Sequence, residues 1–249
     1  MKKIYILALF MSCASVVLAQ RQMEKLDRGL VAVKTATGVF TSWRITGDEF
    51  YGTKYNLYRD GVLIAEGLDV SNYQDAAGTS ANTYTVAAVT ANGIGQQSKA
   101  ASVWSTQYLQ IPLAKVIDPK TGHDVTSVMQ ITDASVADLD GDGQYELVIE
   151  RQNTDFTVGN DSAYTRFEAY TLSGTRLWSV NLGPNMKDGN GSENACFAFD
   201  FDEDGKAEII FRGGDGTILP DGTVLGNASA NYRTDYTGSQ AYMEQGNEY

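Results

Sequence analysis

Short alternations of apolar and polar residues run through the first half of the chain and predict β-strands. β-Branched and aromatic side chains recur in them at a period of two, which is typical of strands with one buried face. The dipeptide Asp60-Gly61 separates two of these segments and favours a tight hairpin turn. The region from Met23 to Leu113 therefore predicts a β-sandwich of about seven short strands. The clearest strand segments are 29–33, 39–43, 55–58, 62–64 and 83–89.

After Leu113 the pattern changes to a repeat. Residues 137–149 align with residues 199–211 at an offset of 200 − 138 = 62 positions. Between the two copies lies a hairpin pattern, 167–172 and 176–180, around Ser173-Gly174. Multi-strand units that recur at a fixed spacing are typical of β-propeller blades. Closed propellers have roughly four to eight blades, so a region this short predicts a partial propeller and a fragment or truncated relative.

Each repeat contains an acidic loop with oxygen donors at alternate positions. Loop positions are counted from Asp138 in the first repeat and from Asp200 in the second. This spacing can surround one cation with hard oxygen ligands, and the glycine at position six, Gly143 or Gly205, permits a sharp turn. Position seven is expected to use its backbone carbonyl, so its side chain is free to vary. The predicted metal ligands at positions one, three, five, seven and nine are Asp138, Asp140, Asp142, Gln144 and Glu146, and Asp200, Asp202, Asp204, Lys206 and Glu208.

These loops differ from an EF-hand because position twelve is Ile149 or Phe211 instead of a bidentate glutamate. Both residues sit in apolar runs, so each loop should lead directly into a strand. Clustered carboxylates repel one another unless a cation neutralises them. Calcium takes about six to eight oxygen ligands in flexible geometry, so it suits such a loop better than magnesium does. We therefore predict calcium as cofactor, with a structural role in fixing strand entry. The alternative is a pair of solvated Asp-Gly turns.

The first residues have the order of a signal peptide. Two lysines are followed by an apolar stretch and then by small residues that end at Ala19, so 1–19 is predicted to be cleaved and the mature chain to begin at Gln20. Cys13 leaves lipoprotein anchoring as an alternative. No later segment has the run of roughly 18 apolar residues that a transmembrane helix needs. A secreted or periplasmic location is expected.

The charge and the cysteine content of the chain limit its binding partners and its covalent cross-links. The formal net charge is −12, with 31 acidic and 19 basic residues, which argues against nucleic acid and anionic membranes. The predicted mature chain has one cysteine, Cys196, so no intramolecular disulfide can form. We expect a monomer stabilised by packing and by metal.

Trp43 and Tyr84 have the placement seen in fibronectin type III modules. Several further strings are characteristic of one enzyme family: 23–33, 58–61, 111–113, 133–143, 174–178, 182–185 and 215–217. They resemble the rhamnogalacturonan lyases of polysaccharide lyase family 11, in the order in which that family has them. The resemblance implies an all-β protein, with a fibronectin type III-like β-sandwich at 20–113 and the first blades of an eight-bladed, calcium-binding β-propeller at 114–249.

The same resemblance implies the reaction. These enzymes degrade pectin by cleaving rhamnogalacturonan I, an acidic polysaccharide, by β-elimination at rhamnose-galacturonate bonds. The chain departs from the family at 150–153, 192–196 and 212–214, and no catalytic base is assigned. Because most of a propeller is missing, we expect lyase activity at full length and little from this chain alone. The alternative function is a non-catalytic, calcium-stabilised carbohydrate-binding or adhesion protein.

Four basic residues near the blade loops are candidates to meet a uronate carboxylate, because guanidinium and ammonium groups pair with carboxylates. They are Arg151, Arg166, Lys187 and Arg212. For each, an internal salt bridge or a solvated side chain is the alternative.

Overall fold

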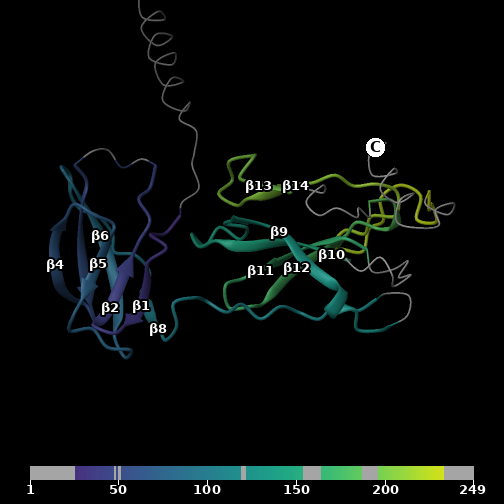
Figure 1. Ribbon diagram of the computed structural model, residues 1–249. Helices are drawn as coiled ribbons and strands as arrows, with labels where there is room; N and C mark the ends of the chain where they lie inside the picture. The colour runs from purple at the N-terminus through teal and green to yellow at the C-terminus, as the bar shows by residue number, and fades with distance from the viewer. Residues whose placement is uncertain are drawn as a thin grey trace, which may run out of the picture.

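The computed structural model describes residues 26–47, 49, 52–118, 122–153, 164–186 and 196–232. Within these ranges the protein is all-β, as predicted, and its helical segments are two short 3-10 turns, η1 (Thr126–Val128) and η2 (Pro184–Met186). The strands form a larger N-terminal sheet and two smaller C-terminal sheets (Figure 1). The predicted signal peptide and the candidate Lys187 lie outside the described residues.

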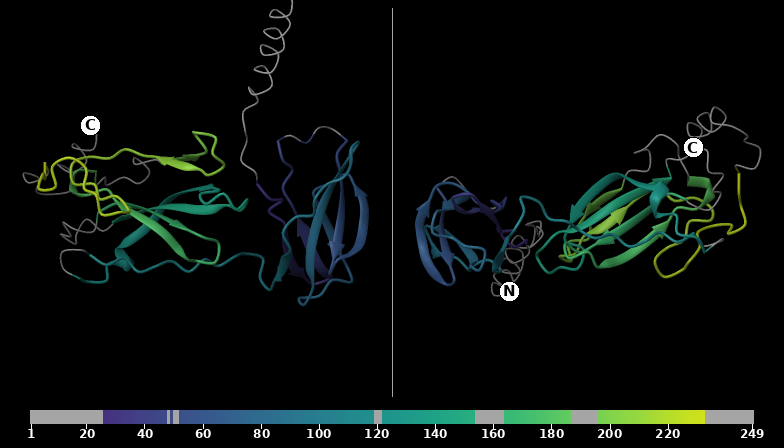
Figure 2. Two further views of the ribbon diagram at one scale, coloured as in Figure 1. Left: turned by 180° about the vertical axis from the view of Figure 1, so that it is seen from behind. Right: turned by 60° about the horizontal axis from the view of Figure 1, so that its bottom comes forward.

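The N-terminal region forms one sheet that curls on itself (Figure 2). Strand β8 joins its two halves, because it pairs with β1 in parallel and with β6 in antiparallel orientation. The strand order is β4-β3-β6-β8-β1-β2-β5, with β7 on β6. The strands are β1 (Val31–Thr35), β2 (Gly38–Ser42), β3 (Lys54–Arg59), β4 (Val62–Leu68), β5 (Asn72–Asp75), β6 (Thr83–Thr90), β7 (Gly93–Ile94) and β8 (Ala101–Trp104).

The two halves of this sheet enclose one apolar core. Val39 comes from one half and Leu57 from the other, and both are fully buried. The aromatic residues that the sequence singled out are part of this core: Trp43 packs edge-on against Tyr55 at 5.5 Å between ring centroids. Tyr84 is fully buried, and its hydroxyl donates a 2.8 Å hydrogen bond to a carboxylate of β5. Because the buried Tyr84 hydroxyl is hydrogen-bonded, the fold avoids the free-energy cost of an unpaired hydroxyl.

The Asp60-Gly61 dipeptide forms the predicted tight turn between β3 and β4. Both residues have positive φ, 49° for Asp60 and 78° for Gly61, as a type I′ turn requires. The Asp60 carboxylate also accepts the backbone N–H of Thr83 at 2.8 Å, which fixes the turn against the start of β6. Register in this hairpin is therefore set by local turn chemistry.

The C-terminal region begins with a four-stranded antiparallel meander in sequence order, the arrangement of a propeller blade. A two-stranded hairpin follows and repeats its first two strands. Phe167 of the meander packs against Phe211 at 5.7 Å, so the two units share a core with Val180 and Leu182. The strands are β9 (Met129–Ala137), β10 (Glu146–Asn153), β11 (Arg166–Tyr170), β12 (Arg176–Asn181), β13 (Phe197–Phe199) and β14 (Glu208–Ile210).

The curled sheet is expected to fold without the rest of the chain. Its core is internal, and β8 ends well before β9 begins, so a polypeptide of residues 20–113 keeps its buried apolar contacts. We expect dispersed amide resonances and cooperative unfolding. In that fragment Leu57→Ala should lower the free energy of unfolding by about 2–5 kcal/mol, whereas Val62→Ala, at an exposed position, should change it little. A disordered amide spectrum from the unsubstituted fragment would show that the predicted boundary at 113 is wrong.

Candidate functional site

Two acidic loops lie at equivalent places in the C-terminal region. The first connects β9 to β10 and the second connects β13 to β14, so each leads into a strand as predicted. In each loop, side chains from positions one, three and nine converge, with carboxylate oxygens within 4.8 Å of one another. The two groups are Asp138, Asp140 and Glu146, and Asp200, Asp202 and Glu208.

The aspartate at position one organises each loop from inside. One oxygen of Asp138 accepts the backbone N–H groups of Gly141 and Asp142, at 2.8 and 3.1 Å, and the other accepts that of Gly143 at 2.8 Å. The carboxylate is 1% exposed. Asp200, which is 3% exposed, accepts the equivalent N–H of Gly205 at 3.0 Å. Both loops are therefore wrapped around a buried carboxylate.

The backbone turns left-handed at two places in each loop. At position six φ is 87° for Gly143 and 94° for Gly205, which confirms the predicted role of this glycine. Position four is also left-handed, with φ of 79° at Gly141 and 64° at Glu203. The sequence did not reveal this second requirement, because Glu203 meets it without being a glycine.

The glutamate at position nine closes each loop. Glu146 accepts the backbone N–H of Leu139 at 2.8 Å, and Glu208 accepts that of Phe201 at 2.9 Å. Burial raises the pKa of Glu146 above its usual value, and the negative charges of Asp140 and other loop carboxylates add to that increase, against the lowering effect of the Leu139 hydrogen bond. Packing like charges together in this way costs free energy unless a cation is bound.

The converging carboxylates could hold a metal ion. Hard carboxylate oxygens converge in both loops, and among the residues that the structure describes no basic side chain pairs with Asp138, Asp140 or Glu146. Asp142 and Asp204, at position five, lie outside the converging groups and accept the backbone N–H of position seven at 2.8 Å. The Asp142 carboxylate is also 3.1 Å from the ammonium group of Lys99. Whether Asp142, Gln144, Asp204 and Lys206 contribute ligands stays a prediction.

A buried polar network occupies one face of the β10–β11 ladder. The Glu168 carboxylate is fully buried and accepts hydrogen bonds from the Tyr170 hydroxyl at 2.7 Å and from Arg151 at 3.2 Å. Arg176 approaches its other oxygen at 3.4 Å. The Arg151 guanidinium also donates to the backbone carbonyl of Ala114 at 3.0 Å. Arg151 is therefore engaged in an internal ion pair, which was the alternative to substrate binding.

The other basic candidates lie in different surroundings. Arg166 is opposite Arg151 in the strand register and is 7% exposed. Its Nε and Nη2 atoms are buried without a hydrogen-bond partner, and burial lowers the pKa of the guanidinium. Arg212 is exposed and follows β14 in the chain. The ladder thus brings Arg151 and Arg166 together in the interior, with Arg212 at the surface.

Sequence reasoning missed a second buried carboxylate. Glu150 is 1% exposed and accepts hydrogen bonds from the Thr132 hydroxyl at 2.8 Å and the Gln152 amide at 3.0 Å. Burial raises the pKa of Glu150, although both hydrogen bonds oppose that shift. The signal for it in the sequence is the polar run 150–153 at the end of an apolar strand, where the chain departs from the family that it resembles.

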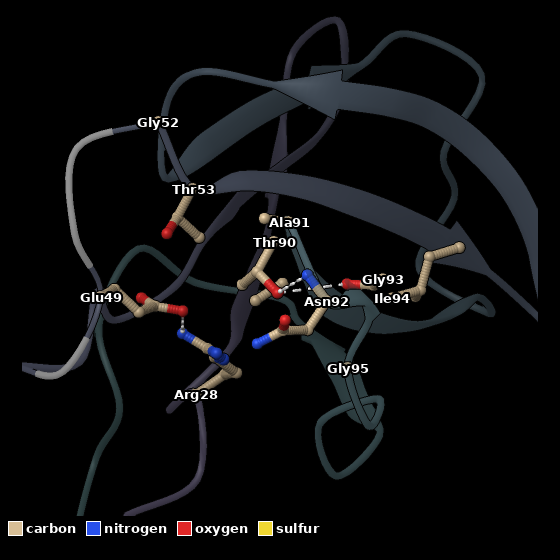
Figure 3. Close-up of a pocket in the computed structure, with 11 residues that line it drawn as sticks. Arg28, Glu49, Gly52, Thr53, Thr90, Ala91, Asn92, Gly93, Ile94 and Gly95 are labelled. Carbon is tan, nitrogen blue, oxygen red and sulfur yellow. Dashed lines mark hydrogen bonds and ion pairs between the residues drawn. The ribbon is translucent and has the colours of Figure 1, made fainter.

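A pocket of about 670 Å³ lies in the N-terminal sheet, apart from the predicted site residues (Figure 3). Thr90 and Asn92 line it, together with an ion pair between Arg28 and Glu49 at 2.5 Å. The hydroxyl of Tyr55 donates to the same glutamate at 2.8 Å. Because the Arg28 charge is already neutralised inside the protein, the pocket offers little attraction for an anionic ligand.

The fold and the loops define a class of protein: an all-β chain in which a curled sheet precedes a blade with repeated acidic loops whose carboxylates converge. Comparison with known families identifies it further. The family described as "Rhamnogalacturonan lyase family 11, C-terminal domain" matches residues 108–249, and "Rhamnogalacturonan I lyases beta-sheet domain" matches residues 21–104. The chain belongs to rhamnogalacturonan lyase family 11.

Individual relatives agree with this assignment. The chain is 43% identical over 222 residues to the rhamnogalacturonan endolyase YesW and 38% identical over 221 residues to the rhamnogalacturonan exolyase YesX, both from Bacillus subtilis. The match covers 87% of this chain and 36% of either relative, so the chain spans about a third of their length.

Solved structures give the same picture. The crystal structure of YesX superposes with a TM-score of 0.73 at 38% identity, over 87% of this chain and 36% of that one. That of YesW superposes with a TM-score of 0.72 at 41% identity, over 87% of this chain and 38% of that one. In the part of the chain that the structure describes, no helix is long and apolar enough to cross a membrane.

Proposed function

We propose that this chain is the N-terminal part of an exported lyase that degrades pectin by cleaving rhamnogalacturonan I. The observation that carries the proposal is the match to a rhamnogalacturonan endolyase over 87% of the chain at 43% identity. The signal-peptide pattern at 1–19 supports export to the periplasm or the medium. The lyases among its relatives favour this function over the carbohydrate-binding or adhesion alternative.

Calcium is proposed as a structural cofactor of the two acidic loops. Support comes from the converging carboxylates at positions one, three and nine and from the left-handed backbone that both loops share. Bound there, a cation would neutralise the charges that raise the pKa of Glu146. In this role the ion stabilises the entry of β10 and β14.

The proposed reaction is a β-elimination on the galacturonate ring. A positive group next to the uronate carboxylate acidifies the C5 proton, a base removes that proton, and the C4 oxygen leaves. Arg151 already forms a buried ion pair with Glu168, which makes it a poor candidate for the positive group. The Nε and Nη2 edge of Arg166 has no hydrogen-bond partner but is buried in the interior, so it is not open to a polysaccharide carboxylate. Of the four candidates we retain Lys187 and the exposed Arg212, and we assign no base.

The lyase proposal can be tested with two proteins. The first is the chain from 20 to 249, and the second is a chimera that joins it to the remaining length of the 43% identical endolyase YesW. We expect the chimera to release unsaturated uronate ends from rhamnogalacturonan I, measured by ultraviolet absorbance. The shorter protein should be slower by at least about a hundredfold, because small misplacements of catalytic groups already cost that much.

The chimera also distinguishes the alternatives. A folded chimera that binds the polysaccharide without cleaving it would favour the carbohydrate-binding function. Robust turnover by the 20–249 protein would instead show that residues 20–249 suffice for catalysis, and the base would then have to lie among them.

A further inference from the structure

The first acidic loop is held against the N-terminal sheet by groups from both regions. The backbone N–H of Asp27 donates to the carbonyl of Gly143 at 2.7 Å. The guanidinium of Arg44 lies over the ring of Tyr145, 4.2 Å from its centroid. Figures 1 and 2 show the loop ends of the blade directed toward the N-terminal sheet. The first loop is therefore both a candidate cation site and a point of contact with the N-terminal region.

Lys99 is the group of the N-terminal region that pairs with a carboxylate of the first loop. Its ammonium donates to the backbone carbonyl of Asp142 at 2.6 Å and lies 3.1 Å from the Asp142 carboxylate. Its own backbone N–H donates to both oxygens of Asp27, at 3.3 and 3.2 Å, which holds this segment at the loop. The segment that precedes β8 thus presents a positive charge to position five of the first loop.

The second loop is placed differently. It lies against the first loop, where the backbone N–H of Ala207 donates to the carbonyl of Asp138 at 2.7 Å. A side chain at Gly141 would approach the carbonyl of Gly205 at 3.2 Å, so the two loops are closely packed. The equivalent of Asp142 in the second loop, Asp204, accepts the backbone N–H of Lys206 at 2.8 Å, as Asp142 does from Gln144. The two loops share their internal geometry and differ in the neighbour at position five.

We propose that Lys99 competes with the bound cation for Asp142, so that the N-terminal sheet lowers the calcium affinity of the first loop relative to the second. The inference rests on the proposed calcium role of these loops. The ammonium offsets one of the loop's negative charges and occupies a carboxylate oxygen at the predicted ligand position. By thermodynamic linkage, calcium in the first loop weakens the contact between Lys99 and Asp142 to the same extent.

Calcium titration of the 20–249 protein, followed by amide NMR, tests the proposal one loop at a time. The Gly143 and Gly205 amides donate to Asp138 and Asp200, so each reports on its own loop. Removing the charge with Lys99→Met should tighten binding at Gly143 by about three- to tenfold, the range expected for one partly exposed charge close to a divalent ion. Binding at Gly205 should change by less than about twofold.

Two control variants separate charge from structure. Lys99→Arg keeps the charge and should retain the affinity of the unsubstituted protein. Lys54→Met removes a lysine that pairs with Asp69 on the N-terminal sheet and should change neither loop. Raising the ionic strength from about 0.05 to 0.5 M should reduce the difference between the unsubstituted protein and Lys99→Met, because salt screens exposed charges.

Each result is decisive. Equal or weaker calcium binding at Gly143 in Lys99→Met would overturn the competition while leaving the calcium proposal in place. Failure of both glycine amides to respond to calcium, in the unsubstituted protein and the variant alike, would overturn the calcium proposal and this inference with it. Should Lys99→Met not fold, Lys99→Gln and the salt dependence of the unsubstituted protein test the same charge.

Discussion

Replacing Glu168 with alanine is expected to destabilise the protein by about 3–5 kcal/mol, the cost of breaking a buried ion pair by removing one partner. The Glu168 side chain is fully buried and that of Arg151 is 4% exposed, so the guanidinium would be left in the interior without its carboxylate. The Tyr170 hydroxyl would lose its acceptor as well. Chemical denaturation of the 20–249 protein and the variant measures the difference.

Two variants show whether the charge or the shape matters. Glu168→Gln keeps the volume and one acceptor but removes the charge, so it should lose most of the same stability. Asp69→Ala breaks the pair between Asp69, whose side chain is 77% exposed, and Lys54, whose side chain is 46% exposed. This variant should lose less than about 1 kcal/mol of stability. A loss from Glu168→Ala no larger than that from Asp69→Ala would contradict the structural role assigned to the network.

The elements that the sequence predicted well are those with a local cause. The β3–β4 turn follows from Asp60-Gly61, because two adjacent residues with positive φ select one hairpin geometry. The acidic loops follow from their aspartate spacing and from Gly143 and Gly205, since each loop folds around its own first carboxylate. In these segments the chemistry that decides the structure lies within a few residues along the chain.

The elements that the sequence did not reveal depend on distant residues. Strand β8 (Ala101–Trp104) joins the halves of the N-terminal sheet by pairing with β1, about seventy residues earlier, and its own composition does not specify that partner. Glu150 and Glu168 lie in buried strands, where a pattern reading places charges on a solvated face. Their burial is made possible by Thr132 and Arg151, partners from neighbouring strands that the fold brings together.

In the candidate metal centres, too, some features follow from local sequence and others depend on distant residues. Spacing alone identified the positions whose carboxylates converge, among them Asp138 and Glu146 in the first loop. The surroundings of Asp142 could not be predicted, because Lys99 is 43 residues away in sequence and reaches the loop through the packing of two regions. A repeat detected in sequence predicts equal sites, and tertiary contacts then make the sites different.

Calcium is expected to raise the thermal stability of the 20–249 protein substantially. A ligand that binds only the folded state adds about 2.7 kcal/mol per site at a hundred times its dissociation constant, which corresponds to roughly 5–10 °C per site for a chain of this size. Binding also relieves repulsion among carboxylates that lie within 4.8 Å of one another in each loop. Melting curves in excess calcium and in excess chelator measure the effect.

Single substitutions divide this shift between the two loops. Asp140→Ala and Asp202→Ala should each remove part of it, whereas Glu66→Ala, at an exposed position in β4, should leave it unchanged. Both aspartates are exposed, so their truncation creates no cavity, and its effect on the calcium shift reports on cation binding. Melting curves that coincide in calcium and in chelator would remove the structural role of calcium. A full shift that survives both aspartate substitutions would instead place the stabilising ion outside these loops.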